Sequence, residues 1–284
     1  MLTYAEAPVQ VTTNPGMSMR TKSAVRAAGS IERSFLPEGV AQLTITSPAR
    51  LNAFSSAMRR QLIEAVTELD ADEGTRAIVL TGEGDRAFSA GQDLTEAQGF
   101  SGEQAQSWVE EWAAVYRAIL NLDTPTVAAL NGYAVGAGFQ VALMCDLRLA
   151  STTARVGMPE IDDAIPCVTG SWALANLLGR AQISDVVLTG RLVSSDEMLG
   201  WGIVSQLVAP DQLLDSAHNL AGVLAKKDRL AVRLDKAWLR RDLLDRLPDA
   251  ERGAKLAHAK AFESGEPRRV MAAFLSKAPA TKRV

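Results

Sequence analysis

Hydrophobic and polar positions follow two periods along the chain, and each period predicts one type of element. Residues 40–46 (VAQLTIT) alternate between apolar and polar, which predicts an edge-exposed strand, and the apolar run at residues 77–81 predicts a buried strand that enters a turn. Apolar residues at helical spacing predict helices over residues 58–69 and 102–120. Strands that alternate with helices at this interval imply crossover units, so the pattern predicts an α/β fold.

The same alternation continues in the second half of the chain. The pattern predicts strands over residues 126–134 and 147–150, a helix opened by Gly136 and Gly138, and helices over residues 169–178 and 181–188. From Asp211 onward the apolar positions are almost entirely helical in spacing. We therefore expect a flexible N-terminal tail (1–34), a sheet-containing core (35–210) and a C-terminal helical region (211–284) that packs on the core or on a neighbouring subunit.

The composition of the chain argues against several classes of functional site. The chain has 284 residues, of which 47% are hydrophobic and 22% charged, and its formal net charge of −3 supplies no basic excess for coating nucleic acid. Its two cysteines, Cys145 and Cys167, and its two histidines, His218 and His258, are too few for a disulfide framework, a histidine-rich metal site or an evident histidine triad. We expect no metal, and carboxylates and backbone groups as the reagents.

Targeting signals are weak. The uncharged run at residues 126–145 is long enough to cross a bilayer, but Asn131 and several glycines interrupt it, so a buried strand, turn and helix explain it better. The first 34 residues contain no apolar signal segment, although the basic, Ser/Ala-rich stretch after Met17 is similar to an organelle transit peptide. We predict a cytoplasmic protein without a membrane span, with an organelle matrix as the alternative.

Two glycine-containing segments could present backbone N–H groups to a ligand. Residues 87–94 (AFSAGQDL) form a strand that breaks at Gly91, and residues 131–138 (NGYAVGAG) lead into a helix N-terminus with its unpaired donors and positive dipole. An ordinary turn and a tightly packed Gly/Ala helix are the alternatives. The glycine spacing does not match G-x-G-x-x-G, which argues against a dinucleotide site.

A third segment, residues 156–163 (VGMPEIDD), offers carboxylates on a loop made rigid by proline. Burial near apolar neighbours such as Met158 would raise the pKa of a carboxyl group toward the range useful for proton transfer. Local sequence alone does not choose between Glu160, Asp162 and Asp163, and a solvated carboxylate is the alternative.

Taken together and in this order, the segments resemble the crotonase superfamily, also called the enoyl-CoA hydratase/isomerase family. The resemblance spans most of the chain and rests on SPARLNAF (47–54), FSAGQDL (88–94), NGYAVGAGFQVALMCD (131–146), MPEI (158–161), GRLVSSDEMLGWGIV (190–204) and AAFLSK (272–277). It implies a spiral of ββα units with a C-terminal helical region, assembled as a homotrimer or homohexamer. It also implies an acyl-CoA thioester substrate that brings the coenzyme A with it, and no other cofactor.

The resemblance also implies roles for particular residues. It places the two backbone donors of the oxyanion hole at Gln92 and Ala137, and the catalytic carboxylate at Glu160. Gln140 stands where hydratases of the family have a second glutamate, and an amide cannot shuttle protons. The resemblance further implies that Cys167 lines the pocket and that Lys277 lies near the CoA phosphates. The implied CoA and substrate contacts are Ala53, Phe54, Ala90, Asp93, Leu94 and Gly138.

Three functions remain open at this point. The first is an enoyl-CoA hydratase/isomerase, hence a lyase or isomerase, that works with the single carboxylate of Glu160 while Gln140 orients a water or a carbonyl. The second is an acyl-CoA decarboxylase or hydrolase that uses the same pair of backbone donors. The third is a catalytically impaired acyl-CoA binder. The helix of residues 102–120 borders the acyl pocket in this family, so Trp108, Trp112 and Tyr116 are candidate pocket residues.

Overall fold

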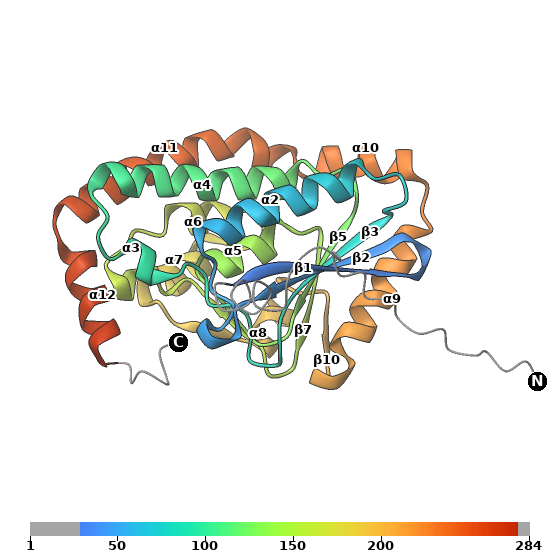
Figure 1. Ribbon diagram of the computed structural model, residues 1–284, viewed down its shortest axis with the longest axis horizontal. Helices are drawn as coiled ribbons and strands as arrows, with labels where there is room; N and C mark the ends of the chain where they lie inside the picture. Colours follow the sequence, from blue (N-terminus) through green and yellow to red (C-terminus); the bar gives the residue numbers. More distant parts are fainter. Residues whose placement is uncertain (1–28, 278–284) are drawn as a thin grey trace, which may run out of the picture.

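Two mixed β-sheets form the framework of the molecule. The computed structural model describes residues 29–277. The first sheet has the strand order β1-β2-β3-β5-β7-β10, with β1 antiparallel to β2 and the other pairs parallel (Figure 1). Its strands are β1 (Ser30–Leu36), β2 (Val40–Thr46), β3 (Ala77–Gly82), β5 (Thr126–Leu130), β7 (Leu147–Ser151) and β10 (Gln206–Val208).

The second sheet is smaller and positions the functional segments. Its order is β4-β6-β8-β9, in which β4, β6 and β8 are parallel and β9 is antiparallel to β8. Its strands are β4 (Ala87–Ser89), β6 (Tyr133–Val135), β8 (Arg155–Gly157) and β9 (Leu192–Ser194). Three strands of the first sheet, β3, β5 and β7, each lead into one strand of the second sheet and then into helical structure. The chain therefore forms the expected repeating ββα units, and the predicted α/β fold is confirmed.

Helices with N-terminal caps cover one face of the first sheet. The side chain of Ser55 caps α2 (Ser56–Ala71), and Ser101 with Gln104 forms a capping box on α4 (Gly102–Leu120), whose bounds match the sequence prediction. The apolar faces of both helices are buried in the larger of two hydrophobic cores. The other helices before the C-terminal region are α3 (Leu94–Ala97), α5 (Ala137–Met144), α6 (Val168–Leu174), α7 (Arg180–Thr189) and α8 (Ser195–Gly200).

The C-terminal helices pack on the core of their own chain. Ala217 and Ala221 of α9 (Leu213–Ala225) join Val79, Val127 and Leu149 in a second core on the opposite face of the first sheet. The helix α11 (Arg241–Glu263) lies alongside α4 at the top of Figure 1, between α10 (Arg229–Leu239) and α12 (Glu266–Lys277). Among the helices of residues 29–277, none is both long and apolar enough to span a membrane.

Two sequence predictions about strands need correction. The strand β2 is internal rather than at the edge, because β1 begins at Ser30 and pairs with its whole length. The first described strand therefore starts inside the stretch expected to be tail. The predicted single strand over residues 126–134 is two strands in different sheets: it breaks at Gly132, where a Cβ atom would lie 2.2 Å from the carbonyl oxygen of Arg86.

Candidate active site

The three segments singled out in the sequence meet at one edge of the second sheet. They follow the neighbouring parallel strands β4, β6 and β8, and the carboxyl ends of parallel strands lie at the same edge. Gly91 (φ +86°) shows how closely the first two approach, since a Cβ atom there would lie 2.8 Å from the oxygen of Val135 and 3.3 Å from the nitrogen of Ala137. A residue other than glycine at this position would push the two segments apart.

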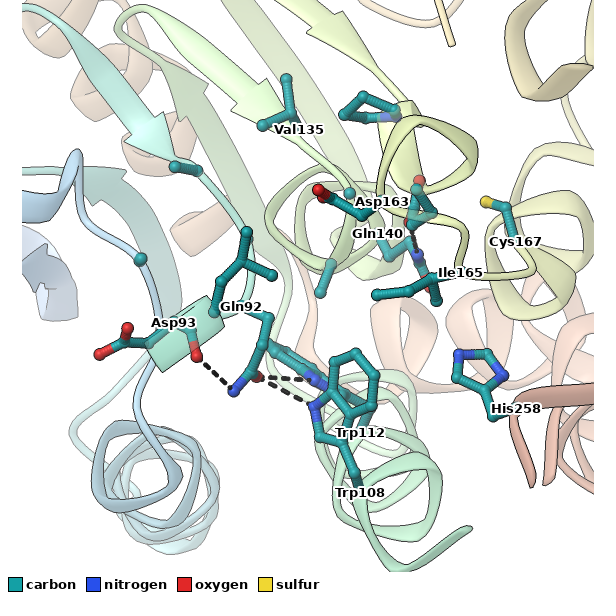
Figure 2. A pocket seen from close by; sticks show the side chains of 18 of the residues that line it. Gln92, Asp93, Trp108, Trp112, Val135, Gln140, Asp163, Ile165, Cys167 and His258 are labelled. Atoms are coloured by element: carbon teal, nitrogen blue, oxygen red, sulfur yellow. Dashed lines mark hydrogen bonds between the residues drawn. The ribbon is translucent and has the colours of Figure 1, made fainter. Parts of the chain in front are cut away.

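A cavity of about 680 Å³ opens where the segments meet, and Figure 2 shows many of the side chains around it. It lies against the second sheet on one side and against α4 and the segment 165–169 on the other. Of the residues expected from the sequence, it brings together Ala53, Ala90, Gln92, Asp93, Leu94, Trp108, Trp112, Tyr116, Ala137, Gln140, Glu160 and Cys167.

The backbone amides of Gln92 and Ala137 are two free donors on the wall of this cavity. Phe54 donates its N–H to the oxygen of Gly91 and accepts one from Asp93, so the amide of Gln92 between them points to the other side. Ala137 is the first residue of α5, where an N–H has no partner within its helix. Within residues 29–277, neither amide donates a hydrogen bond to another protein group.

The side chain of Gln92 is anchored by a buried network of hydrogen bonds beside the cavity. Its Oε1 accepts hydrogen bonds from Arg59 Nη1 (2.6 Å), Trp108 Nε1 (3.0 Å) and Trp112 Nε1 (3.2 Å), and its Nε2 donates to Glu96 (3.1 Å) (Figure 2). Arg59 is itself buried and stacks on the ring of Trp112. The network therefore fixes both the position of the Gln92 backbone and the orientation of the two indole rings.

This network predicts a large loss of stability for Gln92→Leu. The substitution leaves three donors without their acceptor in a buried setting, and each unsatisfied buried donor costs about 1–3 kcal/mol. We expect the free energy of unfolding, measured by urea denaturation, to fall by about 3 kcal/mol. Gln98→Leu removes another amide that lines the cavity, and it should change the stability by less than about 0.5 kcal/mol. Equal losses in the two variants would show that the network contributes nothing specific.

Glu160 lies on the 3₁₀ turn η3 (Pro159–Asp163) and faces the start of α5. Its Oε1 accepts a hydrogen bond from Gln140 Nε2 (3.0 Å) and lies 3.4 Å from where a Cβ of Gly136 would be. Its Oε2 is buried and has no hydrogen-bond partner among the described residues. Burial raises the pKa of Glu160 to about 7, although the neighbouring Cys167 and Gln140 favour the charged form. The carboxyl group can therefore gain or lose a proton near neutral pH.

Gln140 is held in one orientation. The hydroxyl of Tyr116 donates to Gln140 Oε1 (2.9 Å), so the Nε2 group of the same amide faces Glu160. Burial raises the pKa of Tyr116 well above its ordinary value, which keeps the phenol protonated and able to donate. The amide thus acts as a fixed donor to the carboxyl group of Glu160, and it stays neutral because a carboxamide does not ionise near neutral pH.

The geometry separates the three acidic residues that the sequence left equivalent. Residues three apart on a 3₁₀ turn lie on the same side, so Glu160 and Asp163 both line the cavity, whereas Asp162 between them is exposed. Burial, followed by the charge of Asp162, raises the pKa of Asp163. The carboxyl group of Asp163 is thus a second acid on the cavity wall.

Two of the expected substrate contacts lie behind the cavity wall instead. Phe54 is fully buried with its ring edge-on to Trp112 (5.6 Å between centroids), and Gly138 packs so closely that a Cβ would lie 2.6 Å from the oxygen of Ser89. Both residues support the wall through packing. The side chain of Lys277 lies outside the described part of the structure, so its expected contact with phosphates stays a prediction.

Residues that the sequence analysis did not select also line the cavity. His258 reaches it from α11, and Arg50, which pairs with Asp93, lies in its wall with a half-exposed side chain. No local motif marks His258, since it follows Glu160 by almost one hundred residues and enters the site only through the packing of α11 against α4. In the described part of the chain, no group of three or more His, Cys, Asp or Glu side chains is arranged to hold a metal ion.

Comparison with known proteins gives one consistent family. The family model for enoyl-CoA hydratase/isomerase matches residues 36–281. A probable enoyl-CoA hydratase of Rhizobium meliloti is 34% identical over 84% of this chain and 92% of its own, and a carboxymethylproline synthase of Pectobacterium carotovorum is 31% identical over 78% and 89%. The crystal structure of an enoyl-CoA hydratase/isomerase from Pseudoalteromonas atlantica superposes with a TM-score of 0.78, at 27% identity and covering 87% and 97%. The chain therefore belongs to the enoyl-CoA hydratase/isomerase family, the crotonase family.

Proposed function

We propose that this acyl-CoA enzyme moves the double bond of an enoyl-CoA thioester, with Glu160 as its only acid–base group at the reacting carbons. The thioester oxygen accepts hydrogen bonds from the amides of Gln92 and Ala137, which form the oxyanion hole. The carboxylate of Glu160 removes a proton from the carbon next to the thioester, and the electron pair of that C–H bond delocalises onto the thioester oxygen. The same carboxyl group then returns the proton at the far end of the former double bond.

The observation that carries this proposal is the hydrogen bond from the neutral amide of Gln140 to Glu160 (3.0 Å). Adding water across a double bond needs one group that activates the water and a proton donor for the neighbouring carbon. Gln140 can orient a water but cannot take its proton, whereas moving a double bond needs a single group that takes and returns one proton. A carboxyl group with a pKa near 7 suits both halves of that exchange.

The test is to incubate the full chain with trans-3-enoyl-CoA and trans-2-enoyl-CoA thioesters over a range of chain lengths. We expect the first to be converted to the second faster than the second takes up water. Preferential hydration would contradict the single-carboxylate assignment. Tight binding of the thioesters without any turnover would instead favour an acyl-CoA binder.

The acidic limb of the pH profile should report on Glu160. Proton removal needs its carboxylate form, so kcat/KM for isomerisation should fall about tenfold for each pH unit below 7 and level off above it. In Gln140→Leu the donor that favours the carboxylate is lost, so the limb should move to higher pH. A profile that does not change between about pH 5 and 8 would show that Glu160 is not the base.

A second candidate is enolate formation by loss of CO₂ from a malonyl-type thioester. The bond between the carboxylate carbon and the neighbouring carbon breaks, its electron pair stays as the enolate, and Glu160 or an added electrophile completes the reaction. The neutral Gln140 favours this candidate because the step needs no base. A 31% identical relative carries the name carboxymethylproline synthase, which supports a reaction other than enoyl-CoA hydration or isomerisation on this fold. Release of CO₂ from malonyl-CoA would distinguish this candidate from isomerisation.

The proposed assembly is a homotrimer or homohexamer, and α10 supplies a surface suited to it. Leu230, Leu234 and Trp238 follow one another at one-turn spacing and are 61%, 60% and 68% exposed. The charged Lys236 faces inward and pairs with Asp146. An apolar stripe of this kind on the outside of a subunit is typical of an interface.

A further inference from the structure

The cavity has a polar group that the proposed proton transfer does not use, the imidazole of His258. The residue is 6% exposed and lines the cavity from α11. Its Nδ1 lies 2.8 Å from the carbonyl oxygen of Ala254. Because a carbonyl oxygen can only accept, Nδ1 carries the hydrogen, and the neutral ring therefore has a lone pair on Nε2. Burial lowers the pKa of His258, which favours this neutral form.

The Nε2 atom has no hydrogen-bond partner among the described residues, and the residue that carries it lines the cavity. Figure 2 shows its imidazole ring among the side chains that surround the cavity. Polar atoms in such surroundings are normally paired, and leaving one unpaired costs about 1–3 kcal/mol. The atom is thus an acceptor that a ligand in the cavity can satisfy.

His258 is separated from the reacting end of the cavity by an indole ring. Trp108 donates its N–H to Gln92 on one side (3.0 Å), and its ring lies edge-on to the imidazole on the other (5.7 Å between centroids, 75° between planes). The aromatic ring of Phe262 also contacts Trp108 there. In Figure 2, His258 and Asp93 lie on opposite sides of Gln92, and Asp93 is one of the residues expected to contact the CoA. The imidazole is therefore on the wall that would face the distal part of an acyl group held at Gln92 and Ala137.

We propose that His258 Nε2 accepts a hydrogen bond from a hydroxyl or amino group on the distal part of the acyl chain. The enzyme would then select acyl-CoA thioesters with a polar donor over purely apolar ones of equal length. This inference rests on the proposed function only in placing the thioester at Gln92 and Ala137. It requires binding and no particular reaction.

The test measures binding of saturated, unreactive thioesters by calorimetry. Pairs of equal length end in a methyl or in a hydroxyl group, with ω-amino thioesters as a third arm that separates the two donor chemistries. One hydrogen bond of ordinary strength corresponds to about a tenfold change in Kd. The selectivity is the Kd of the methyl-ended thioester divided by the Kd of the hydroxyl-ended or ω-amino thioester. We expect this ratio to be about tenfold smaller in His258→Phe than in the wild type.

His218→Phe is the matched control, because that histidine lies on α9 and hydrogen-bonds Gln42 away from the cavity. It should leave the ratio unchanged. If the wild type binds no acyl-CoA thioester, the proposed function fails; if it binds all three types and His258→Phe leaves their ratios unchanged, the polar subsite alone fails.

If the His258→Phe variant does not fold, NMR of the wild-type protein tests the proposal instead. The chain has only two histidines, so the imidazole ¹⁵N signals of the labelled wild-type protein can be assigned with His218→Phe alone. The Nε2 signal of His258 should shift when the hydroxyl or amino thioester binds and stay in place with the methyl thioester. Identical shifts with all ligands would overturn the proposal.

Discussion

Replacing Glu160 by glutamine should lower kcat for isomerisation by about a hundred- to ten-thousand-fold, equivalent to about 3–5 kcal/mol of barrier. The amide keeps the size of the side chain and can still accept the hydrogen bond that Gln140 Nε2 donates to Glu160 Oε1. It can no longer remove a proton from the substrate. Because the substitution preserves the shape of the side chain and removes only its ability to transfer a proton, KM should change little while kcat falls by the amount given above.

The turn η3 supplies matched controls for this variant. Asp162→Asn changes an exposed carboxylate on the same turn and should leave kcat within about twofold of the wild type. Asp163→Asn changes the other acid on the cavity wall and should cost less than about tenfold, since Asp163 does not contact the Gln140 amide. If Asp163→Asn were the more damaging variant, the proton would be moved by Asp163, and the assignment of Glu160 would be wrong.

The parts of the site that the sequence predicts are those encoded locally. Gln92, Ala137 and Glu160 each lie within three residues of the end of a short strand, so a motif read along the chain already contains the residue and its backbone setting. The parallel order of β4, β6 and β8 then brings the three motifs together. The helix of α4 was predictable for the same reason, because its apolar period and its capping residues lie within one continuous segment.

What could not be predicted depends on contacts between distant segments. Local sequence leaves Glu160, Asp162 and Asp163 equivalent, and only the family resemblance selects Glu160; the place of Asp163 on the cavity wall needs the 3₁₀ turn. The raised pKa of Glu160 needs burial in the folded chain, beside Gln140 of α5. Likewise, nothing near Gln92 in sequence indicates that two indoles of α4 donate to its side chain, or that His258 of α11 enters the same cavity. Polar residues of this kind are specified by tertiary packing, which local periodicity does not encode.

The helix start at Ala137 offers a way to remove one oxyanion donor without disturbing a side chain. Ala137→Pro deletes the amide hydrogen at the first position of α5, where proline is compatible with a helix. The preceding Gly136 (φ +54°, ψ −131°) is already outside the right-handed helical region that a following proline disfavours. Loss of one such donor should lower kcat by about a hundred- to a thousand-fold.

Ala137→Gly is the matched control, because it removes a methyl group and keeps the N–H, so its kcat should stay within a few-fold of the wild type. The proline variant should bind a saturated acyl-CoA more weakly, since its ring Cδ takes the place of the amide hydrogen, but the loss in kcat should exceed the loss in binding because the donor stabilises the charge that develops on the thioester oxygen more than it stabilises the ground state. Calorimetric binding and the circular dichroism spectrum check that the fold is intact. If a folded Ala137→Pro variant turned over as fast as Ala137→Gly, the negative charge would be stabilised elsewhere, and the pairing of Gln92 with Ala137 would have to be abandoned.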